Sequence, residues 1–98
     1  MTQRQESLQD LAEAMRVSRD NYHHIRALVV RQLSSNQQQI YGMVESIGEV
    51  SPREIADKHG WVINYVSSEL KALKELGLLE RWAERDENGR QFVYRVKP

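Results

Sequence analysis

Apolar residues between positions 34 and 78 recur at intervals of three or four, the spacing of an α-helix facing a core. The first stripe consists of Ile40, Met43, Val44 and Ile47. It predicts a helix over 34–48 that ends at Gly48. Good N-cap residues stand at its start, namely Ser34, Ser35 and Asn36.

A second, shorter helix is predicted by a capping box. Ser51 is followed three residues later by Glu54, and Pro52 takes the first helical position. The apolar residues of this helix are Ile55 and Ala56. Gly60 should end the helix in a tight turn, because glycine most readily adopts the left-handed C-cap conformation.

A third helix is predicted from Val62 to Gly77. Its apolar stripe consists of Ile63, Val66, Leu70, Leu73, Leu76 and Leu78. The opposite face carries polar side chains at Asn64, Ser67, Ser68, Lys71 and Lys74. Two unlike faces on one helix predict that one packs on a core and the other meets solvent or a ligand.

Beyond Gly77 the apolar period changes to two, which predicts a β-hairpin. One strand carries Leu79, Arg81 and Ala83, and the other carries Phe92, Tyr94 and Val96. The turn could be two residues, Asn88-Gly89, or a four-residue loop over 86–89. We favour the longer loop, which pairs Ala83 with Phe92, Leu79 with Val96 and Glu80 with Arg95, because it gathers the apolar residues on one face.

The predicted order is helix, short helix, glycine turn, longer helix and hairpin, a mainly α fold with a small β-hairpin. A tight turn between the two short helices makes them cross steeply and directs the third outward, where it could enter a major groove about 12 Å wide. The segments 51–60 and 65–81 resemble bacterial and archaeal winged helix-turn-helix regulators of the MarR and ArsR types. The resemblance covers 34–98, leaving 1–33 as an N-terminal helical extension.

The resemblance implies a sequence-specific, double-stranded DNA-binding transcriptional regulator, such as a repressor. The third helix would then be the recognition helix, touching base edges through Asn64, Ser67, Ser68, Lys71 and Lys74. Residues on the wing or near the backbone, Arg53, Arg85 and Arg90, would contact phosphate or the minor groove.

Composition sets the class of protein. The 98 residues fit one compact domain, or one domain with a helical arm, and no cysteine is available for a disulfide or a thiolate zinc site. We expect a cytoplasmic protein, because the chain has neither a membrane-length apolar run nor a signal-peptide core. We find no catalytic arrangement, and so predict no enzyme and no cofactor. His23 and His24 point about 100° apart on a helix, so no metal site is predicted.

Net charge leaves a second function open. The 14 basic and 14 acidic residues cancel, so DNA affinity would depend on where the charges lie. Val62 stands where recognition helices usually begin with a polar residue, and Asp86 and Glu87 make the wing tip acidic. These features favour the alternative, a winged helix that serves as a protein-interaction module in an assembly.

The N-terminal third has two interpretations. The favoured one is a dimerisation arm, because an apolar stripe of Tyr22, Ile25, Leu28, Val29 and Leu33 must be buried somewhere. A homodimer would place two recognition helices one DNA turn apart to read an inverted repeat. The other interpretation is a second, incomplete helix-turn-helix, because Leu11-Ala12-Glu13 echoes Ile55-Ala56-Asp57.

Overall fold

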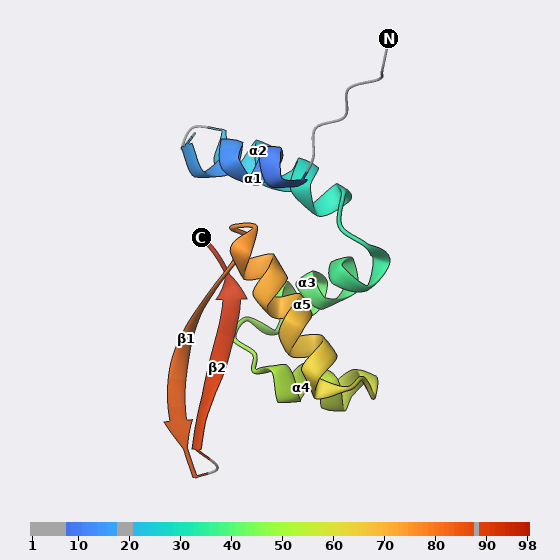
Figure 1. Cartoon of the computed structure of the whole chain (residues 1–98), viewed down its shortest axis with the longest axis vertical. Coiled ribbons are helices and arrows are strands. Elements are labelled where there is room, and N and C mark those ends of the chain that lie inside the picture. The colour runs from blue at the N-terminus through green and yellow to red at the C-terminus, as the bar shows by residue number, and fades with distance from the viewer. Residues whose placement is uncertain (1–7, 18–20, 88) are drawn as a thin grey trace.

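In the part of the chain that the structure describes, five helices precede a β-hairpin, in the order of a winged helix-turn-helix (Figure 1). A computed structural model describes residues 8–17, 21–87 and 89–98. The elements are α1 (Leu8–Val17), α2 (Tyr22–Arg31), α3 (Ser35–Ile47), α4 (Pro52–His59), α5 (Ile63–Glu75), β1 (Leu79–Asp86) and β2 (Gly89–Val96). The predicted fold class is therefore confirmed.

Helices α3 and α4 begin where local chemistry directs, and a glycine ends α4. Ser34 and Ser51 each cap a helix through a capping box, with Gln37 and Glu54 as their reciprocal partners. Gly60 takes the left-handed conformation at φ 69° and ψ 26°, and the Trp61 N–H donates to the Ala56 carbonyl at 3.1 Å. The predicted capping box at Ser51 and the glycine turn are thus confirmed.

The core formed by these helices is apolar and continuous. Its fully buried side chains include Ile40, Val44, Ile55, Val66, Leu70, Leu73 and Leu78. The prediction that Ile47 and Ile63 face the core was wrong, because Ile47 is 40% exposed and Ile63 is 39% exposed. Each occupies a terminal residue of its helix, where the direction around the axis is right but no neighbouring element reaches far enough to cover it.

Helix α5 is shorter than predicted. It ends at Glu75, and Leu76 caps it in place of Gly77. Gly77 instead adopts φ 87°, a conformation that side chains rarely take, and turns the chain into β1. Leu76 stays buried, so the stripe continues for one residue after the helix has ended.

The hairpin has the predicted register and a different turn. Leu79 pairs with Val96, Glu80 with Arg95 and Ala83 with Phe92, as predicted. The four-residue loop was wrong, however, because pairing continues to Asp86 and Gly89 and leaves two connecting residues.

An isolated bridge joins the hairpin to the helices. The N–H of Val50 donates to the Tyr94 carbonyl at 3.0 Å, and the N–H of Tyr94 donates back at 2.7 Å. Val50 precedes α4 directly, so the bridge sets β2 beside the helix-turn-helix.

The extension formed by α1 and α2 shares the same core. Leu11, Ala12, Met15, Val29 and Leu33 are buried in one cluster with the side chains of α3 and α5. Together α1 and α2 cover the end of the molecule opposite the hairpin turn (Figure 1).

Polar contacts also link the extension to the C-terminal end of the chain. The Tyr22 hydroxyl donates to the carbonyls of Gly77 and Lys97, each at 3.4 Å, and Arg26 donates to the Lys97 carbonyl at 3.3 Å. These bonds span 55 to 75 residues of sequence.

None of the described helices has the length and apolar character needed to cross a membrane.

Candidate nucleic-acid interface

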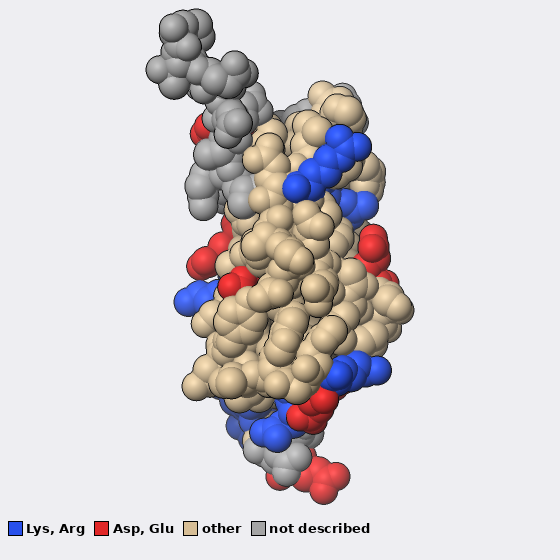
Figure 2. Space-filling view, turned by 90° about the vertical axis from the view of Figure 1, so that its right-hand side faces the viewer, with Lys and Arg blue, Asp and Glu red and all other residues tan. Residues whose placement is uncertain are grey.

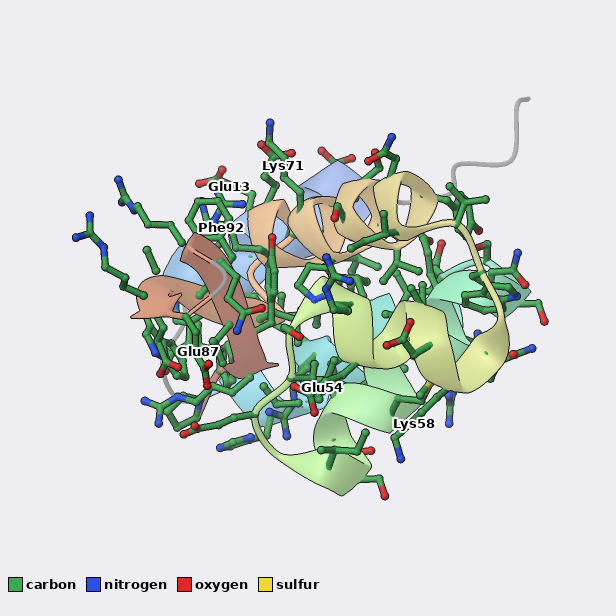
Figure 3. All side chains as sticks on the ribbon, turned by 90° about the horizontal axis from the view of Figure 1, so that it is seen from below. Glu13, Glu54, Lys58, Lys71, Glu87 and Phe92 are labelled. Atoms are coloured by element: carbon green, nitrogen blue, oxygen red, sulfur yellow. The ribbon has the colours of Figure 1, made fainter. Side chains whose placement is uncertain are left out.

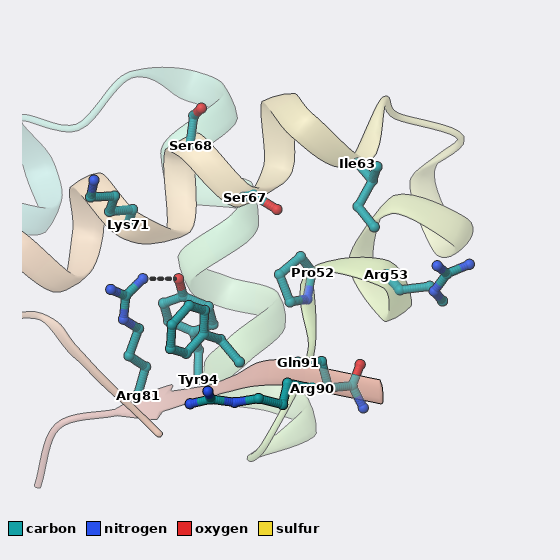
Figure 4. A pocket seen from close by; sticks show the side chains of 11 residues that line it. Pro52, Arg53, Ile63, Ser67, Ser68, Lys71, Arg81, Arg90, Gln91 and Tyr94 are labelled. Atoms are coloured by element: carbon teal, nitrogen blue, oxygen red, sulfur yellow. Dashed lines mark hydrogen bonds between the residues drawn. The ribbon is translucent and has the colours of Figure 1, made fainter. Parts of the chain in front are cut away.

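A cleft of about 530 Å³ separates α5 from the hairpin (Figure 4). Helix α5 contributes Ile63, Ser67, Ser68 and Lys71 to its lining, and the start of α4 contributes Pro52 and Arg53. The hairpin contributes Arg81, Arg90, Gln91, Phe92 and Tyr94. The Val50–Tyr94 bridge places β2 where its side chains can form this wall.

The α5 wall changes chemically along the helix. Ile63, Ser67 and Lys71 are spaced by four residues and therefore share one face. From the first turn of α5 towards its C-terminal end, these residues present an apolar group, a hydroxyl and a cation to the cleft. Such a wall could contact base edges at one end and a phosphate at the other.

On the hairpin wall, Arg81 is held by aromatic neighbours. Its guanidinium carbon lies 3.9 Å from the centroid of the Phe92 ring, and its Nη1 donates to the Tyr94 hydroxyl at 3.0 Å. Tyr94 is only 2% exposed, so the acceptor sits on a rigid ring. This arrangement orients the guanidinium yet leaves most of its five N–H donors for a ligand.

The cleft is electropositive although the chain has no net charge. Its lining includes the cations Arg53, Lys71, Arg81 and Arg90, and no acidic side chain among the described residues. Within the described chain none of these four forms an ion pair, whereas Arg95, outside the cleft, pairs with Glu80. Among the described residues the cations of the cleft therefore have no anionic partner.

Two acidic side chains of the hairpin, Glu80 and Glu84, find partners on its outer face. Glu80 pairs with Arg95 directly opposite on β2, and Glu84 accepts from the Trp82 indole at 2.8 Å. The Arg95 guanidinium also lies 5.5 Å from the Trp82 ring. Because strand side chains alternate between faces, Arg81 points the other way, and the two charges are separated across the sheet.

Two arginines face each other near the end of the hairpin. Arg85 and Arg90 are cross-strand partners on the face that also carries Arg81. Like charges directly opposite destabilise a strand pair unless an anion lies between them. The register sets Glu80 and Glu84 on the outer face, so neither glutamate lies opposite Arg85 or Arg90.

Lysines on α4 and α5 occupy different sides of the molecule. Seen from below, Lys71 lies near Phe92, and Lys58 lies on the far side of α4 (Figure 3). Both lysines are exposed, but only Lys71 lines the cleft. Lys58 is therefore a natural control for Lys71.

The structure brings together five of the predicted DNA-contact residues, Arg53, Ser67, Ser68, Lys71 and Arg90. The other three, Asn64, Lys74 and Arg85, are exposed but do not line the cleft. Sequence reasoning missed Arg81 and Gln91. Alternation along β1 already placed Arg81 on the face of Tyr94 and Phe92, and an arginine set directly opposite Tyr94 was the available signal.

The residues predicted for dimerisation divide into two groups. Val29 and Leu33 are buried within the single chain, at 0% and 5% exposure. Tyr22, Ile25 and Leu28 are half-buried against the same core and keep part of their surface. The part of the stripe that a partner could reach is therefore confined to these three.

A broad face beside the cleft carries few charges. In the view of Figure 2 most of its middle is formed by uncharged side chains, and lysine, arginine and carboxylate groups lie around its edges.

Three aromatic rings lie together at the α4–α5 turn. The Trp61 ring stacks on the His59 ring with 4.5 Å between the ring centroids, and it meets the Tyr65 ring edge-on at 5.9 Å. Trp61 packs against the core.

Comparison with known proteins supports the fold. The chain is similar to the solved structure of a possible transcriptional regulator from Methanosarcina mazei Go1, with a TM-score of 0.61 and 12% identity. The match covers 79% of this chain and 67% of that one. No protein-family model matches the chain, and no curated protein matches it. The resemblance to MarR and ArsR regulators in particular stays a prediction.

Proposed function

We propose that this protein is a sequence-specific, double-stranded DNA-binding transcriptional regulator. The observation that carries the proposal is the cleft between α5 and the hairpin, lined by cations that have no anionic partner among the described residues. A duplex presents a regular row of phosphates, and neutralising them provides much of the affinity of DNA-binding proteins. The similarity to a structure described as a possible transcriptional regulator is in keeping with this proposal.

In the proposed complex, α5 lies in the major groove and the hairpin lies along the adjacent backbone. Ser67 and Ser68 then meet base edges, with Asn64 exposed one turn earlier on the helix. Lys71 and Arg81 face a phosphate from opposite walls of the cleft. The opposed pair Arg85 and Arg90 gains from a phosphate that relieves its repulsion.

We further propose that the protein acts as a homodimer on an inverted repeat. One chain supplies only a small set of free cations, and two chains would double the number of phosphate contacts. The surface offered for pairing is the uncovered part of Tyr22, Ile25 and Leu28, on the extension. That position leaves the cleft and the hairpin turn free, because the extension lies at the other end of the molecule (Figure 1).

A selection experiment tests the proposal. The full chain is mixed with a randomised duplex pool, bound duplexes are amplified, and the affinity for the enriched site is measured at several salt concentrations. We expect a selectable site, uniformly weaker binding by Lys71→Ala on every duplex, and altered base preference in Ser68→Ala. Lys58→Ala, the control, should bind like the unmodified protein, because Lys58 lies outside the cleft. A pool that yields no site, with no loss of binding in Lys71→Ala, would contradict the proposal.

The uncharged face in Figure 2 favours a second candidate, a protein-interaction module that does not read DNA. A face with few charged side chains is typical of the core of a protein–protein interface. A complex of fixed stoichiometry that resists high salt and forms equally well with Lys71→Ala would favour this candidate. Phosphate contacts would instead weaken steeply with salt.

A further inference from the structure

The first turn of α5 carries apolar surface that the chain leaves uncovered. Val62 is 69% exposed and Ile63 is 39% exposed. Val62 is also the N-cap of α5 and makes no side-chain cap hydrogen bond, whereas serines cap α3 and α4. Valine is a poor N-cap residue, so α5 begins with a weak cap. The same position also exposes apolar surface. Local rules are most often broken where another molecule is contacted.

Part of this apolar surface, Ile63, belongs to the cleft, and Val62 lies next to it in the chain. Ile63 lines the cleft together with Ser67 and Lys71, and Figure 4 shows it on the first turn of α5, beside Pro52 and Arg53. In helix-turn-helix proteins the N-terminal residues of the recognition helix are those that meet base edges. Ile63 is therefore placed where base edges, and not phosphates, would be reached.

Resting on the proposed function, we infer that Ile63, aided by Val62, recognises the C5-methyl group of thymine. Among the four bases, thymine is the one that displays an apolar methyl group in the major groove. The next residue, Asn64, is exposed and has the amide needed for a bidentate contact with adenine N6 and N7. The start of α5 thus carries one partner for each base of an A·T pair.

The cleft also distinguishes DNA from a protein as the occupant. A protein partner for Ile63 would meet Arg53 and Lys71 in the same cleft, two cations that have no anionic partner among the described residues. A thymine-containing duplex offers a partner for both kinds of group, an apolar methyl for Ile63 and an anionic backbone for the cations. The combination selects A·T pairs at the positions read by the first turn.

Uracil substitution provides the test. In the duplex selected from the pool, each thymine is replaced in turn by deoxyuridine, which removes only the methyl group and keeps base pairing. We expect the unmodified protein to lose about fourfold in affinity at one or two positions, the effect of uncovering one buried methyl group. Ile63→Ala should bind the thymine and uracil duplexes nearly equally. Ser68→Ala, the matched control on the same helix, should keep the uracil effect.

A second variant separates the effect on base recognition from the effect on protein stability. Val62→Ser supplies the missing N-cap, so its melting temperature should rise while its uracil effect shrinks. Equal affinity of the unmodified protein for every uracil duplex would overturn the inference and leave the proposed function standing. An uracil effect that is unchanged in both Ile63→Ala and Val62→Ser would also overturn it. A pool that yields no site would instead overturn the proposed function, and this inference with it.

Discussion

At the scale of single residues, Arg81 shows how the cleft keeps its charge. A partly buried guanidinium is usually neutralised by a carboxylate, which would also cancel its attraction for an anion. Here Phe92 and Tyr94 orient the group through a cation–π contact and one hydrogen bond, and the charge stays available. Glu80 and Glu84 are kept from it by the alternation of the strands.

Gly60 and Gly42 make a matched pair for testing backbone conformation. Gly60 has φ 69°, and a Cβ there would meet open space, so Gly60→Ala should cost only the left-handed strain, about 1–2 kcal/mol. Gly42 lies inside α3 with equal room, so Gly42→Ala should stabilise the protein by about 0.5–1 kcal/mol. Urea unfolding should show midpoints moving in opposite directions. A Gly60→Ala protein as stable as the unmodified one would contradict the assigned turn.

Tyr41 predicts a loss of stability at alkaline pH. Burial raises the pKa of its hydroxyl above the ordinary value of 10.0; Arg26 opposes the rise, and Glu45 adds to it. The folded state therefore favours the neutral phenol, and the contribution to stability, complete below pH 10, is lost as the pH rises through the raised pKa. Urea unfolding between pH 8 and 11 should show a smaller decline for Tyr41→Phe. An identical decline in both proteins would show that Tyr41 is not responsible.

At the scale of elements, the hairpin is a strand pair with two electrostatic faces. The outer face pairs Glu80 with Arg95, whereas the inner face sets Arg85 opposite Arg90. The inner pair weakens the isolated hairpin, and the outer pair strengthens it. Such an arrangement is consistent with an element whose inner face is completed by an anionic ligand.

Charge reversal on the inner face should move stability and binding in opposite directions. Arg85→Glu sets a carboxylate opposite Arg90, so we expect the free energy of unfolding to rise by about 0.2–1 kcal/mol. The same change opposes a phosphate, so DNA affinity should fall on the order of tenfold. Arg95→Glu, the control on the outer face, should lower stability by setting a carboxylate opposite Glu80. Parallel changes in stability and affinity for Arg85→Glu would contradict the two-faced hairpin.

At the scale of the whole molecule, the distribution of charge matters more than its sum. Fourteen basic and fourteen acidic residues cancel, yet the charged side chains in the described lining of the cleft are all cations. The extension of α1 and α2 closes the core at the opposite end and holds the C-terminal strand through Tyr22 and Arg26. One end of the molecule is thus suited to an anionic ligand and the other to packing.

The dependence of DNA affinity on salt concentration can show how many chains bind one duplex. Each phosphate contact contributes about 0.9 to the slope of log affinity against log salt concentration. Lys71→Ala should therefore reduce the slope by about 0.9 if one chain binds and by about 1.8 if a dimer binds, which we expect. The solution mass with and without duplex gives the same stoichiometry independently. A reduction near 0.9 with a monomeric mass would contradict the homodimer.

Local features of the fold were predictable because their causes lie within a few residues. Ser51 and Glu54 form a capping box four residues long, and Gly60 is where a left-handed residue is needed. The register of the hairpin followed from gathering apolar side chains on one face. The turn length was misjudged, because paired residues near the turn need not be apolar.

Prediction was poorer wherever distant segments decide the outcome. Periodicity placed Ile63 on the core side of α5, but whether a neighbour covers a helix end depends on how the elements pack. The same limit applied to Arg81, which the alternation placed correctly and which became a cleft residue only because β2 is bridged to Val50. Of the predicted contact residues, Asn64 and Lys74 stand outside the cleft for similar reasons.

By itself the sequence determined which segments are helical, where α4 begins and ends, and which strand residues face each other, since capping, glycine conformation and side-chain alternation act over short distances. The tertiary structure alone decided that the extension packs on the core and that α5 and the hairpin enclose a cleft. It also decided that the cations of that cleft lie apart from every carboxylate that could pair with them within the described chain. Those properties depend on contacts between residues far apart in sequence, which short-range patterns do not encode.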